Sequence, residues 1–341
     1  MKYIFVVRQL TSGGAENATI ILGKELSSRG HTVEVWNLGV DSTNDMPKWN
    51  SWAKVNKITP LTLLLFRPKN NERMILVNNV GYKYVKPKNA ISILHGDCTE
   101  RFSLANNLFY KIYEFLRIRN RFSKRKNIII SEILANKLEL FTNHPVKYIP
   151  NPFDPNKVII KSNENLEINL PDNFIVHVGR LSYQKNQEHI LLDYLSNEEL
   201  YNKVDLVFIG GDSSKEKNTE KKLLQLIKNH PLENKVHFLG DIINPYPIIK
   251  KSKCLILCSR FESMGYVLLE AMVLNIPIVS TNKQGPYEVL GNEFLGLVAD
   301  NENLSHTIIK AINNPKLYKK KLPTRYNKEK VCDEFELFTK E

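Results

Sequence analysis

Residues 254–272 read CLILCSRFESMGYVLLEAM, and this stretch decides the fold. It opens with five apolar residues in a row, continues through a short polar loop, and spaces its apolar residues as a helix does from Gly265 onward. A strand with apolar residues at consecutive positions is typical of a parallel sheet that is covered on both faces. The stretch therefore predicts a strand–loop–helix unit of an α/β protein.

The same alternation of apolar runs and amphipathic segments continues through the rest of the chain. Helices are predicted over 15–28, 216–229 and 266–275, and helical spacing also covers 328–339. The alternation indicates doubly wound α/β domains. Strands of about five residues are predicted at 3–7, 32–36, 74–77, 91–94, 128–130, 174–178, 206–209, 236–239, 254–258 and 276–280.

The alternation pauses at Asn151-Pro152-Phe153 and in the polar residues up to Asn169. A chain of 341 residues is long enough for two domains of ordinary size. We therefore predict Rossmann-like domains over 1–152 and 153–322, with a C-terminal helix in 323–341 that packs back on the first domain. A cleft between two such domains is a natural ligand site, because ligands gather at the carboxyl ends of parallel strands.

Composition and charge exclude several classes of protein. Hydrophobic residues make up 42% and charged residues 25% of the chain, which excludes wholesale disorder. No apolar run reaches the roughly 18–20 residues of a membrane span, and the first residues lack a signal peptide's apolar region, so we expect a cytoplasmic protein. The four cysteines have no zinc-site spacing, and a disulfide framework is not expected. A net charge of +12 favours acidic partners such as nucleotide phosphates, anionic membranes or nucleic acid.

Two glycines follow the first predicted strand. Gly13 and Gly14 precede a predicted helix, where they let the backbone approach a ligand and leave amide groups free at the helix start. On the pair alone, a tight strand-to-helix turn is the simpler interpretation. The spacing is not Gly-x-Gly-x-x-Gly, so it does not support a nicotinamide site.

A pair of cations follows the first strand of the second predicted domain. Arg180 and Lys185 lie five positions apart in the loop after 174–178, directly behind Gly179. Two cations at the carboxyl end of a buried strand can hold a diphosphate from two sides, Arg by a bidentate fork and Lys as a mobile point charge. Solvated loop charges are the alternative, and the buried strand before the pair favours a phosphate site.

Two glutamates flank the predicted helix start in 254–272. Glu262 lies in the loop, and Glu270 lies roughly 7 Å along the helix axis from Gly265. A diphosphate could rest on the free amides of the helix start, where the helix dipole is positive. A ribose beside the helix would then meet Glu270, and a sugar on the other side would meet Glu262, since carboxylates accept hydrogen bonds from hydroxyls.

Taken in order, these motifs resemble a retaining glycosyltransferase of the GT-B fold, family GT4. The resemblance implies an α/β protein with two Rossmann-like domains facing a cleft, the first on the acceptor side and the second binding a nucleotide-sugar. The domain junction departs from the family's usual Pro-Asn-Gly, because it reads Pro150-Asn151-Pro152. The matching segments are Gly13-Gly14-Ala15-Glu16, Val178-Gly179-Arg180-Leu181 with Lys185-Asn186, Phe208-Ile209-Gly210-Gly211, Phe238-Leu239-Gly240, the Glu262/Glu270 pair and Gly285-Pro286-Tyr287-Glu288.

The resemblance also implies a role for each site residue. Arg180 and Lys185 would neutralise the diphosphate, Glu270 would bind the ribose, and Glu262 would position the transferred sugar. His95 would face the donor sugar, although by itself it reads as a structural histidine that ends a strand. The other substrate-binding residues would be Gly13, Gly14, Gly179, Leu239, Gly240, Asp241, Ile242, Ser263, Met264 and Gly265.

No metal or other cofactor is expected for the transfer. The chain has no Asp-x-Asp motif, and two cations with a helix start can stabilise the leaving diphosphate without a metal. The family suggests that the acceptor attacks on the face from which the diphosphate leaves, and that the departing phosphate takes the proton. Glu262 would then position the sugar rather than act as a nucleophile.

Residues 101–126, from Arg101 to Lys126, predict contact with an anionic membrane surface. They hold eight basic residues and one acidic residue, interleaved with Phe, Tyr, Leu and Ile. A basic amphipathic helix can lie on an anionic bilayer. A helix with one core face and one solvated basic face explains the pattern equally well. The cations expected to face the bilayer are Arg117, Arg119, Arg121, Lys124 and Arg125.

We expect a UDP-linked hexose or N-acetylhexosamine as donor and a glycan, or a polyprenyl- or lipid-linked glycan, as acceptor. Abundant Asn, Lys and Ile indicate an AT-rich coding sequence, which favours bacterial surface polysaccharide or lipopolysaccharide synthesis. A GT-B epimerase or hydrolase would use similar phosphate contacts and is the first alternative. A nucleic-acid-binding protein is a distant alternative, because no recognition motif is visible, and we expect no nucleic-acid partner.

Overall fold

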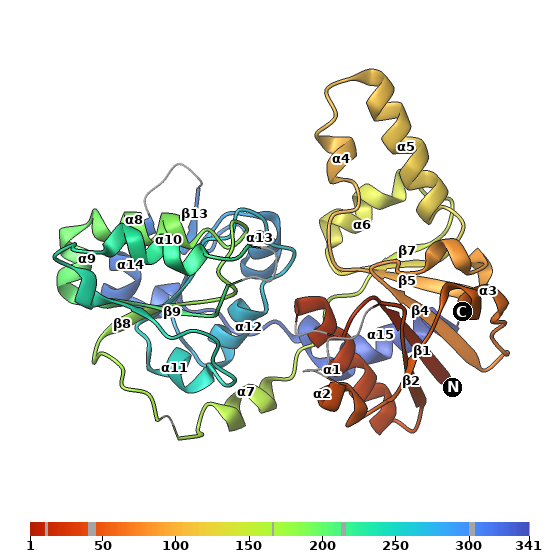
Figure 1. The fold of residues 1–341 in the computed structure, drawn as a ribbon, viewed down its shortest axis with the longest axis horizontal. Coiled ribbons are helices and arrows are strands. Elements are labelled where there is room, and N and C mark those ends of the chain that lie inside the picture. The colour runs from red at the N-terminus through yellow and green to blue at the C-terminus, as the bar shows by residue number, and fades with distance from the viewer. Residues whose placement is uncertain (11–12, 40–45, 166, 213–215, 300–303, 341) are drawn as a thin grey trace. The chain divides into compact units, whose positions relative to one another are not determined.

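The computed structural model describes residues 1–10, 13–39, 46–165, 167–212, 216–299 and 304–340 (Figure 1). The chain forms two compact units. The first comprises Met1–Asp154 together with Pro323–Glu341, and the second comprises Pro155–Leu322. Each unit is an α/β domain built on its own parallel sheet.

The first unit contains a seven-stranded parallel sheet in the order β3-β2-β1-β4-β5-β6-β7. The central strand β1 is buried along most of its length, and its Val6 pairs with Trp36 on one side and Leu76 on the other. The strands are β1 (Lys2–Val7), β2 (Thr32–Asn37), β3 (Lys54–Lys57), β4 (Glu72–Val77), β5 (Ala90–Leu94), β6 (Asn127–Ile129) and β7 (Val146–Tyr148). The helices are α1 (Gly14–Ser28), α2 (Met46–Asn50), α3 (Pro60–Leu65), α4 (Glu100–Ser103), α5 (Leu108–Phe122), α6 (Glu132–Glu139) and α15 (Lys328–Lys340).

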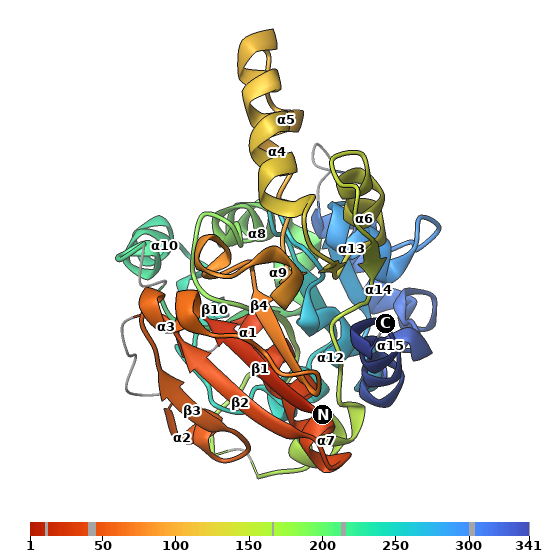
Figure 2. The same cartoon turned by 90° about the vertical axis from the view of Figure 1, so that its right-hand side faces the viewer.

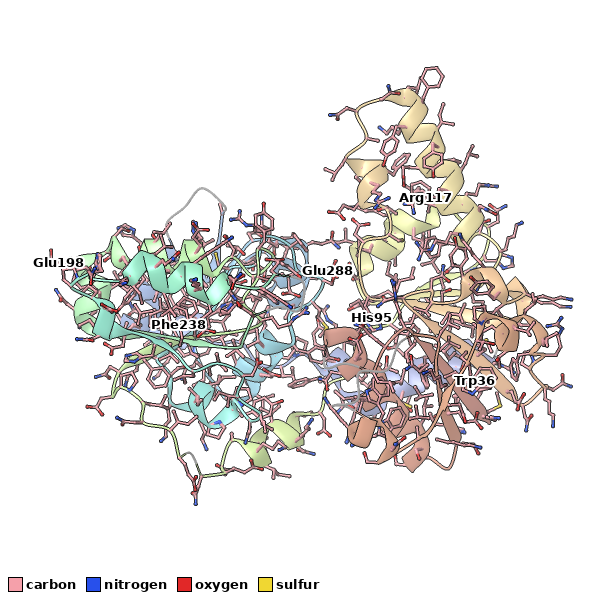
Figure 3. The ribbon with its side chains drawn as sticks, viewed as in Figure 1. Trp36, His95, Arg117, Glu198, Phe238 and Glu288 are labelled. Carbon is pink, nitrogen blue, oxygen red and sulfur yellow. The ribbon has the colours of Figure 1, made fainter. Side chains whose placement is uncertain are left out.

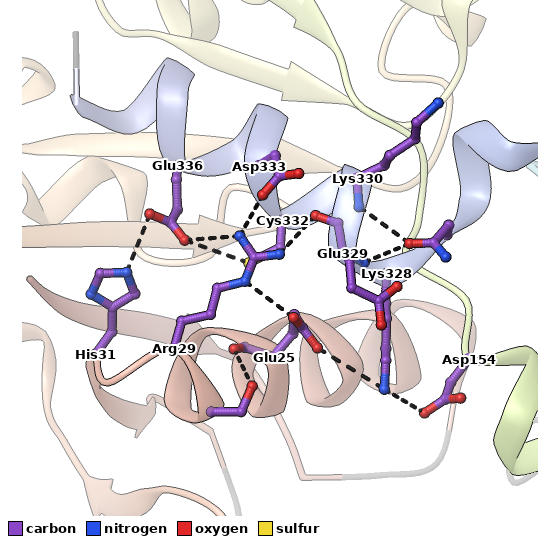
Figure 4. A network of polar contacts seen from close by, with 12 residues as sticks. Glu25, Arg29, His31, Asp154, Lys328, Glu329, Lys330, Cys332, Asp333 and Glu336 are labelled. Carbon is purple, nitrogen blue, oxygen red and sulfur yellow. Dashed lines mark hydrogen bonds and ion pairs between the residues drawn. The ribbon is translucent and has the colours of Figure 1, made fainter.

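The C-terminal helix α15 packs against α1 within the first unit. Its Phe335 lies in the same apolar core as Phe5 and Leu26. Polar contacts around Arg29 add to this packing (Figure 4): its Nη1 donates to Asp333 at 2.6 Å, and its Nη2 donates to the backbone carbonyl of Glu329 at 2.9 Å. The last helix is therefore part of the first unit's fold.

Helices α4 and α5 stand away from the sheet of their own unit (Figure 2). Asn107 caps the start of α5, because its side chain accepts hydrogen bonds from the amides of Phe109 and Tyr110. The helix is anchored by the buried side chains of Glu114, Ile118 and Phe122. The first half of the helix therefore carries its apolar side chains in an exposed position.

The second unit contains a six-stranded parallel sheet in the order β10-β9-β8-β11-β12-β13. Its core includes Ile175, Leu206 and Ile256 from three adjacent strands. The strands are β8 (Phe174–Val178), β9 (Asp205–Ile209), β10 (Val236–Phe238), β11 (Cys254–Leu257), β12 (Ile278–Thr281) and β13 (Leu297–Val298). The helices are α7 (Pro155–Lys161), α8 (Gln187–Leu195), α9 (Glu198–Lys203), α10 (Thr219–Ile227), α11 (Tyr246–Lys251), α12 (Tyr266–Val273), α13 (Gln284–Leu290) and α14 (Leu304–Asn313).

Two parallel, helix-covered sheets confirm the predicted α/β fold class. Each predicted strand is present, but the sequence analysis missed β3, β7 and β13 at the sheet edges. Their sequences KVNK, VKY and LV are short or polar, because an edge strand need not be buried on both faces. In the described part of the chain, no helix has the length and apolar character to cross a bilayer.

Candidate functional site

The second unit's sheet reverses its strand order between β8 and β11. The chain runs outward from β8 through β9 to β10, and then returns to place β11 against the other side of β8. Ligands of open α/β sheets bind beyond the carboxyl ends of the strands at such a reversal. The loops that follow β8 and β11 carry Arg180 and Glu262, so the structure brings the two predicted motifs to this edge.

The loop after β8 is held close to the end of β9. The amide of Gly179 donates to the carbonyl of Ile209 at 2.9 Å, and a Cβ on Gly210 would lie 2.3 Å from the carbonyl oxygen of Gly179. Glycine is therefore required at position 210, where φ is +129°. Arg180 is exposed at the edge, whereas Lys185 turns inward and is partly buried.

A buried histidine fixes this loop from below. His177 lies on β8 with its Nδ1 3.0 Å from the carbonyl oxygen of Ile256 and its Nε2 3.1 Å from the Gln187 amide nitrogen. Burial lowers the pKa of His177 to about 4, so the ring is neutral, donates through Nδ1 and accepts at Nε2. Gln187 also donates to the carbonyl of Arg180 at 2.9 Å and accepts from the amide of Ser182 at 3.3 Å.

The sequence analysis missed His177 and Gln187 as supports of the loop that carries Arg180. A signal was present, because His177 is the polar residue in the otherwise apolar strand FIVHV. A buried polar side chain needs hydrogen-bond partners. Its partners come from β11 and the first turn of α8, which no spacing rule connects to β8.

Lys185 and Glu262 form an ion pair in the structure. Lys185 Nζ lies 2.5 Å from Glu262 Oε2, and the hydroxyl of Ser259 donates to the same oxygen at 3.2 Å. The sequence analysis assigned Lys185 to a diphosphate and Glu262 to a sugar. The structure instead pairs the two side chains with each other. Both side chains are largely buried, and opposite charges removed from water stabilise each other when paired.

Gly265 begins helix α12 in the left-handed conformation, with φ of +82°. Among the described residues no side-chain hydrogen bond caps this helix, and the positive end of its dipole would favour an anion there. Met264 just before it is buried and Ser263 is partly buried. The structure therefore places the predicted helix start, together with its glycine, beside the Glu262 loop.

Glu270 follows one turn later on α12. The Tyr246 hydroxyl donates to its Oε1 at 3.4 Å. Burial raises the pKa of Glu270 to about 7, an effect that the Tyr246 hydrogen bond and the positive charge of Lys157 only partly offset. The carboxyl group therefore loses its proton near neutral pH, where it becomes a full acceptor for hydroxyl groups.

The loop after β10 completes the same edge. The amide of Leu239 donates to the carbonyl of Phe208 at 3.0 Å, and the carbonyl of Gly240 accepts from the amide of Gly210 at 2.8 Å. Asp241 uses its carboxylate to accept from the amide of Gly211 at 2.7 Å. The loop 239–242 thus joins the glycines after β9, while the side chain of Ile242 is only partly buried.

The first unit holds the remaining predicted residues. Gly13 precedes α1 and Gly14 is its first residue, whereas residues 11 and 12 of the same turn lie outside the described residues. His95 follows β5 (Figure 3), and its amide donates to the side chain of Asn78 at 3.0 Å. Burial lowers the pKa of His95 to about 4, offset only in part by the neighbouring Asn151 side chain. The His95 ring is therefore a neutral hydrogen-bonding group.

Asparagines in the turn after β4 are a further feature that sequence analysis missed. Asn78 and Asn79 both adopt positive φ, at 52° and 59°. Asn79 is buried and accepts from the hydroxyl of Ser92 on β5 at 2.7 Å. The Asn-Asn pair at the end of an apolar strand was the available signal, because asparagine tolerates the left-handed conformation. Together the two side chains tie this turn to β5 and to the backbone of His95.

The structure corrects two of the five cations that were expected to face a membrane. Arg117 on α5 (Figure 3) pairs with the buried Glu114 at 2.5 Å, and Arg125 is itself buried. The Arg117 guanidinium is already paired and Arg125 is removed from solvent, so neither is the solvated surface cation that was expected. The residues that α4 and α5 expose include several large apolar side chains, among them Leu108 and Phe109.

Comparison with known proteins supplies the context for this geometry. Residues 158–329 match the family model described as glycosyl transferases group 1. An uncharacterized glycosyltransferase, MJ1059 of Methanocaldococcus jannaschii, is 30% identical over 241 residues, covering 68% of this chain and 54% of its own length. An N-acetylgalactosamine-N,N'-diacetylbacillosaminyl-diphospho-undecaprenol 4-alpha-N-acetylgalactosaminyltransferase of Campylobacter jejuni is 34% identical over 166 residues, covering 47% of this chain and 43% of its own. This chain thus spans about half the length of the curated relatives it matches.

Solved structures share the fold over nearly the whole chain. Anabaena Alr3699/HepE, in complex with UDP and glucose, superposes with a TM-score of 0.74 at 18% identity and covers 99% of both chains. WaaG, a glycosyltransferase involved in lipopolysaccharide biosynthesis, superposes with a TM-score of 0.65 at 16% identity, covering 98% of this chain and 94% of its own. These likenesses establish the GT-B-like architecture of two parallel α/β sheets.

Proposed function

The chain belongs to the glycosyl transferases group 1 family, and we propose that it is a retaining glycosyltransferase acting on a UDP-sugar. The donated sugar would be a hexose or N-acetylhexosamine, and the acceptor a glycan or lipid-linked glycan. One observation carries the proposal. The loop of Arg180 and Lys185 and the uncapped start of α12 lie at the strand-order reversal of one sheet.

Donor binding follows from the charges at this edge. A diphosphate on the first amides of α12 would meet the exposed guanidinium of Arg180 and draw Lys185 away from Glu262. Released from Lys185, the Glu262 carboxylate would accept hydrogen bonds from the sugar hydroxyls. Ribose hydroxyls would donate to Glu270, and the loop 239–242 would frame the base. UDP is proposed because the Anabaena relative is a complex with UDP-glucose.

The transfer step needs charge stabilisation more than a nucleophile from the protein. The bond between the sugar's anomeric carbon and the diphosphate oxygen breaks, and the acceptor oxygen bonds to the same carbon on the same face. The acceptor's proton passes to the departing phosphate oxygen. Arg180, Lys185 and the α12 amides stabilise the growing negative charge of the leaving group. His95 would serve as a neutral hydrogen-bonding partner for the sugar.

A lipid-linked acceptor is supported by the exposed apolar side chains of α4 and α5, which we call the α5 tip. It comprises Leu104, Leu108, Phe109, Ile112, Tyr113 and Leu116, of which Phe109 is 83% exposed. The exposed cations Arg101 and Lys111 lie among them. An apolar face flanked by cations can enter the headgroup region of an anionic bilayer. The Campylobacter relative bears the name of an enzyme with a diphospho-undecaprenol acceptor.

A thermal-shift screen against UDP-, GDP- and ADP-sugars tests the donor. We expect stabilisation by UDP-sugars, and nucleotide release that depends on an added acceptor glycan. Stabilisation by GDP-sugars alone would overturn the choice of UDP. Nucleotide release or sugar isomerisation that needs no acceptor would instead assign the chain as a hydrolase or epimerase.

Vesicle co-sedimentation tests the α5 tip. Leu108→Ser with Phe109→Ser should reduce binding to phosphatidylglycerol vesicles, because it removes exposed apolar side chains from the tip. Ile160→Ser is the matched control, since Ile160 is 69% exposed and Leu108 is 70% exposed, but Ile160 lies on α7 in the second unit. Equal binding by both variants and the unchanged protein would contradict the membrane role.

A further inference from the structure

A second polar site lies in the first unit, at the edge opposite to His95. A cavity of about 960 Å³ opens where β4 and β5 begin, whereas His95 and Gly13 follow the ends of β5 and β1. Its walls are the turn before β4, the segment before β5 and the residues between α5 and β6. Ligands of α/β sheets usually bind at the other edge, so the family's donor and acceptor chemistry does not explain this cavity.

The cavity is strongly basic. Its lining includes one carboxylate among the described residues, Glu72, which already pairs with Lys2 at 3.4 Å. Seven cations line the same space: Lys69, Arg73, Lys86, Lys88, Lys124, Arg125 and Lys126. So many like charges around one hollow repel one another and create a positive potential that attracts anions.

Arg125 lies within this lining with its charge incompletely satisfied. The residue is 4% exposed, and its Nη2 donates to the carbonyl of Tyr82 at 3.2 Å. Among the described residues its Nε and Nη1 have no hydrogen-bond partner. Burial lowers the pKa of Arg125 to about 10, which still leaves the guanidinium charged at neutral pH. A buried guanidinium with two of its three nitrogens closed to water and lacking acceptors is costly, and an anion that enters beside it would supply the missing acceptors.

Two other cations are already engaged and hold the cavity wall in place. Arg73 Nε donates to the carbonyl of Thr339 at 2.7 Å, and Lys126 Nζ donates to that of Phe338 at 3.3 Å. These bonds tie the sheet edge to the end of α15. The remaining cations Lys69, Lys86, Lys88 and Lys124 are exposed, and they take part in none of the ion pairs of the described residues. They are free to converge on a ligand.

We propose that this cavity binds a ligand carrying two or more phosphate groups, held by the Arg125 guanidinium and by Lys86, Lys88 and Lys124. A guanidinium fork matches two phosphate oxygens, and mobile lysines can neutralise the others. The number of cations exceeds what one monoanion needs. The phosphates could belong to a free polyphosphorylated compound or to an anionic lipid headgroup, and the shared chemistry is the oligophosphate group.

Calorimetric titration of the full chain with sodium tripolyphosphate tests the proposal. Lys86→Gln with Lys88→Gln should weaken binding by about tenfold or more, because it removes two charge-assisted contacts. Lys221→Gln with Lys316→Gln is the matched control, since it removes the same charge from exposed positions in the second unit. An equal loss in both double variants would show a non-specific charge effect and would overturn the proposal.

A second pair of variants separates this cavity from the donor site. Arg180→Gln should leave tripolyphosphate binding at the cavity unchanged, and a loss confined to Arg180→Gln would place the anion at the donor site and overturn the proposal. Arg125→Met should abolish the stabilisation by tripolyphosphate in a thermal melt. Without the anion it should melt no lower than the unchanged protein, because it removes an unsatisfied buried charge. Retained stabilisation in this variant would also refute the assignment.

Vesicles distinguish the two sources of phosphate. If the ligand is a lipid headgroup, Lys86→Gln with Lys88→Gln will bind vesicles that contain a lipid with a diphosphate headgroup less well than the Lys221→Gln/Lys316→Gln control variant. If the ligand is a free compound, the two variants will bind vesicles equally while differing in tripolyphosphate affinity. These binding measurements do not depend on the proposed transferase activity, since they are made without a sugar donor.

Discussion

Replacing Gln187 by Leu is the sharpest test of how the Arg180 loop is held. Gln187 bonds His177 at 3.1 Å, the carbonyl of Arg180 at 2.9 Å and the amide of Ser182 at 3.3 Å. Leucine has nearly the same size but offers none of these bonds. Because the residue is buried, His177 Nε2 and the Ser182 amide would be left without partners, and the Arg180 carbonyl would keep only the long bond from the Ser182 hydroxyl at 3.5 Å.

The expected cost is about 2–4 kcal/mol, since each unsatisfied buried polar group costs about 1–3 kcal/mol and the loop can relax toward water. For a unit of this size, that loss lowers the apparent Tm by about 5–15 °C. Scanning calorimetry should show the shift in the transition of the second unit. The displaced loop should also reduce kcat/KM for the nucleotide-sugar by about 10- to 100-fold, because Arg180 would no longer be held in place.

Gln225→Leu provides the matched control, because it makes the same chemical change at an exposed position on α10. A Gln187→Leu protein that melts and turns over like this control would refute the network. A lower Tm with unchanged kcat/KM would show that Gln187 supports the fold without positioning the Arg180 loop.

Three further changes probe the candidate site and the C-terminal helix. The affinity for UDP should rise between pH 6 and 8 as Glu270 loses its proton. In a titration series, Glu270→Gln should make the affinity independent of pH. An affinity that is already independent of pH in the unchanged protein would argue against ribose binding by Glu270. Stability should change with pH in the opposite direction to UDP affinity, because the pKa of Glu270 in the folded protein is about 7, above the usual value of 4.5. The stability that protonated Glu270 contributes is therefore complete below about pH 4.5 and is lost as the pH rises through 7. Glu262→Gln should tighten UDP binding while lowering kcat, because Lys185 is freed for the diphosphate and the sugar loses its carboxylate; weaker UDP binding in equilibrium dialysis would contradict this. Arg29→Met should lower the free energy of unfolding of the first unit by about 1 kcal/mol, since partly exposed ion pairs contribute little. An unchanged midpoint in a denaturant melt would show that the bonds of Arg29 to Asp333 and Glu329 add nothing to stability.

Much of the fold was predictable because its signal is local. The apolar runs at 174–178 and 254–258 are buried strands, and the helix predicted at 266–275 is α12, Tyr266–Val273. Where two local signals compete, the length of an apolar run was insufficient. The apolar run 61–66 has the length of a strand, yet Pro60–Leu65 is a helix because Thr59 forms a capping box at its start.

The candidate site was predictable in position but not in its pairings. Arg180, Lys185, Glu262 and Glu270 were identified from the loops and helix that follow two buried strands. The Lys185–Glu262 ion pair was not, because the two residues lie 77 positions apart in the sequence. Their contact depends on β8 and β11 becoming neighbours, which is a property of the sheet order.

The sequence by itself determined which segments are buried strands, where the glycine-bearing and charged loops follow them, and to which family those motifs belong. These properties depend on residues close together in the chain. Only the tertiary structure decided that His177 supports the Arg180 loop, that Arg125 is buried beside a basic cavity, and that α5 exposes apolar side chains. Burial and charge pairing depend on which distant segments are in contact. The strand order, rather than the local sequence pattern, determines those contacts.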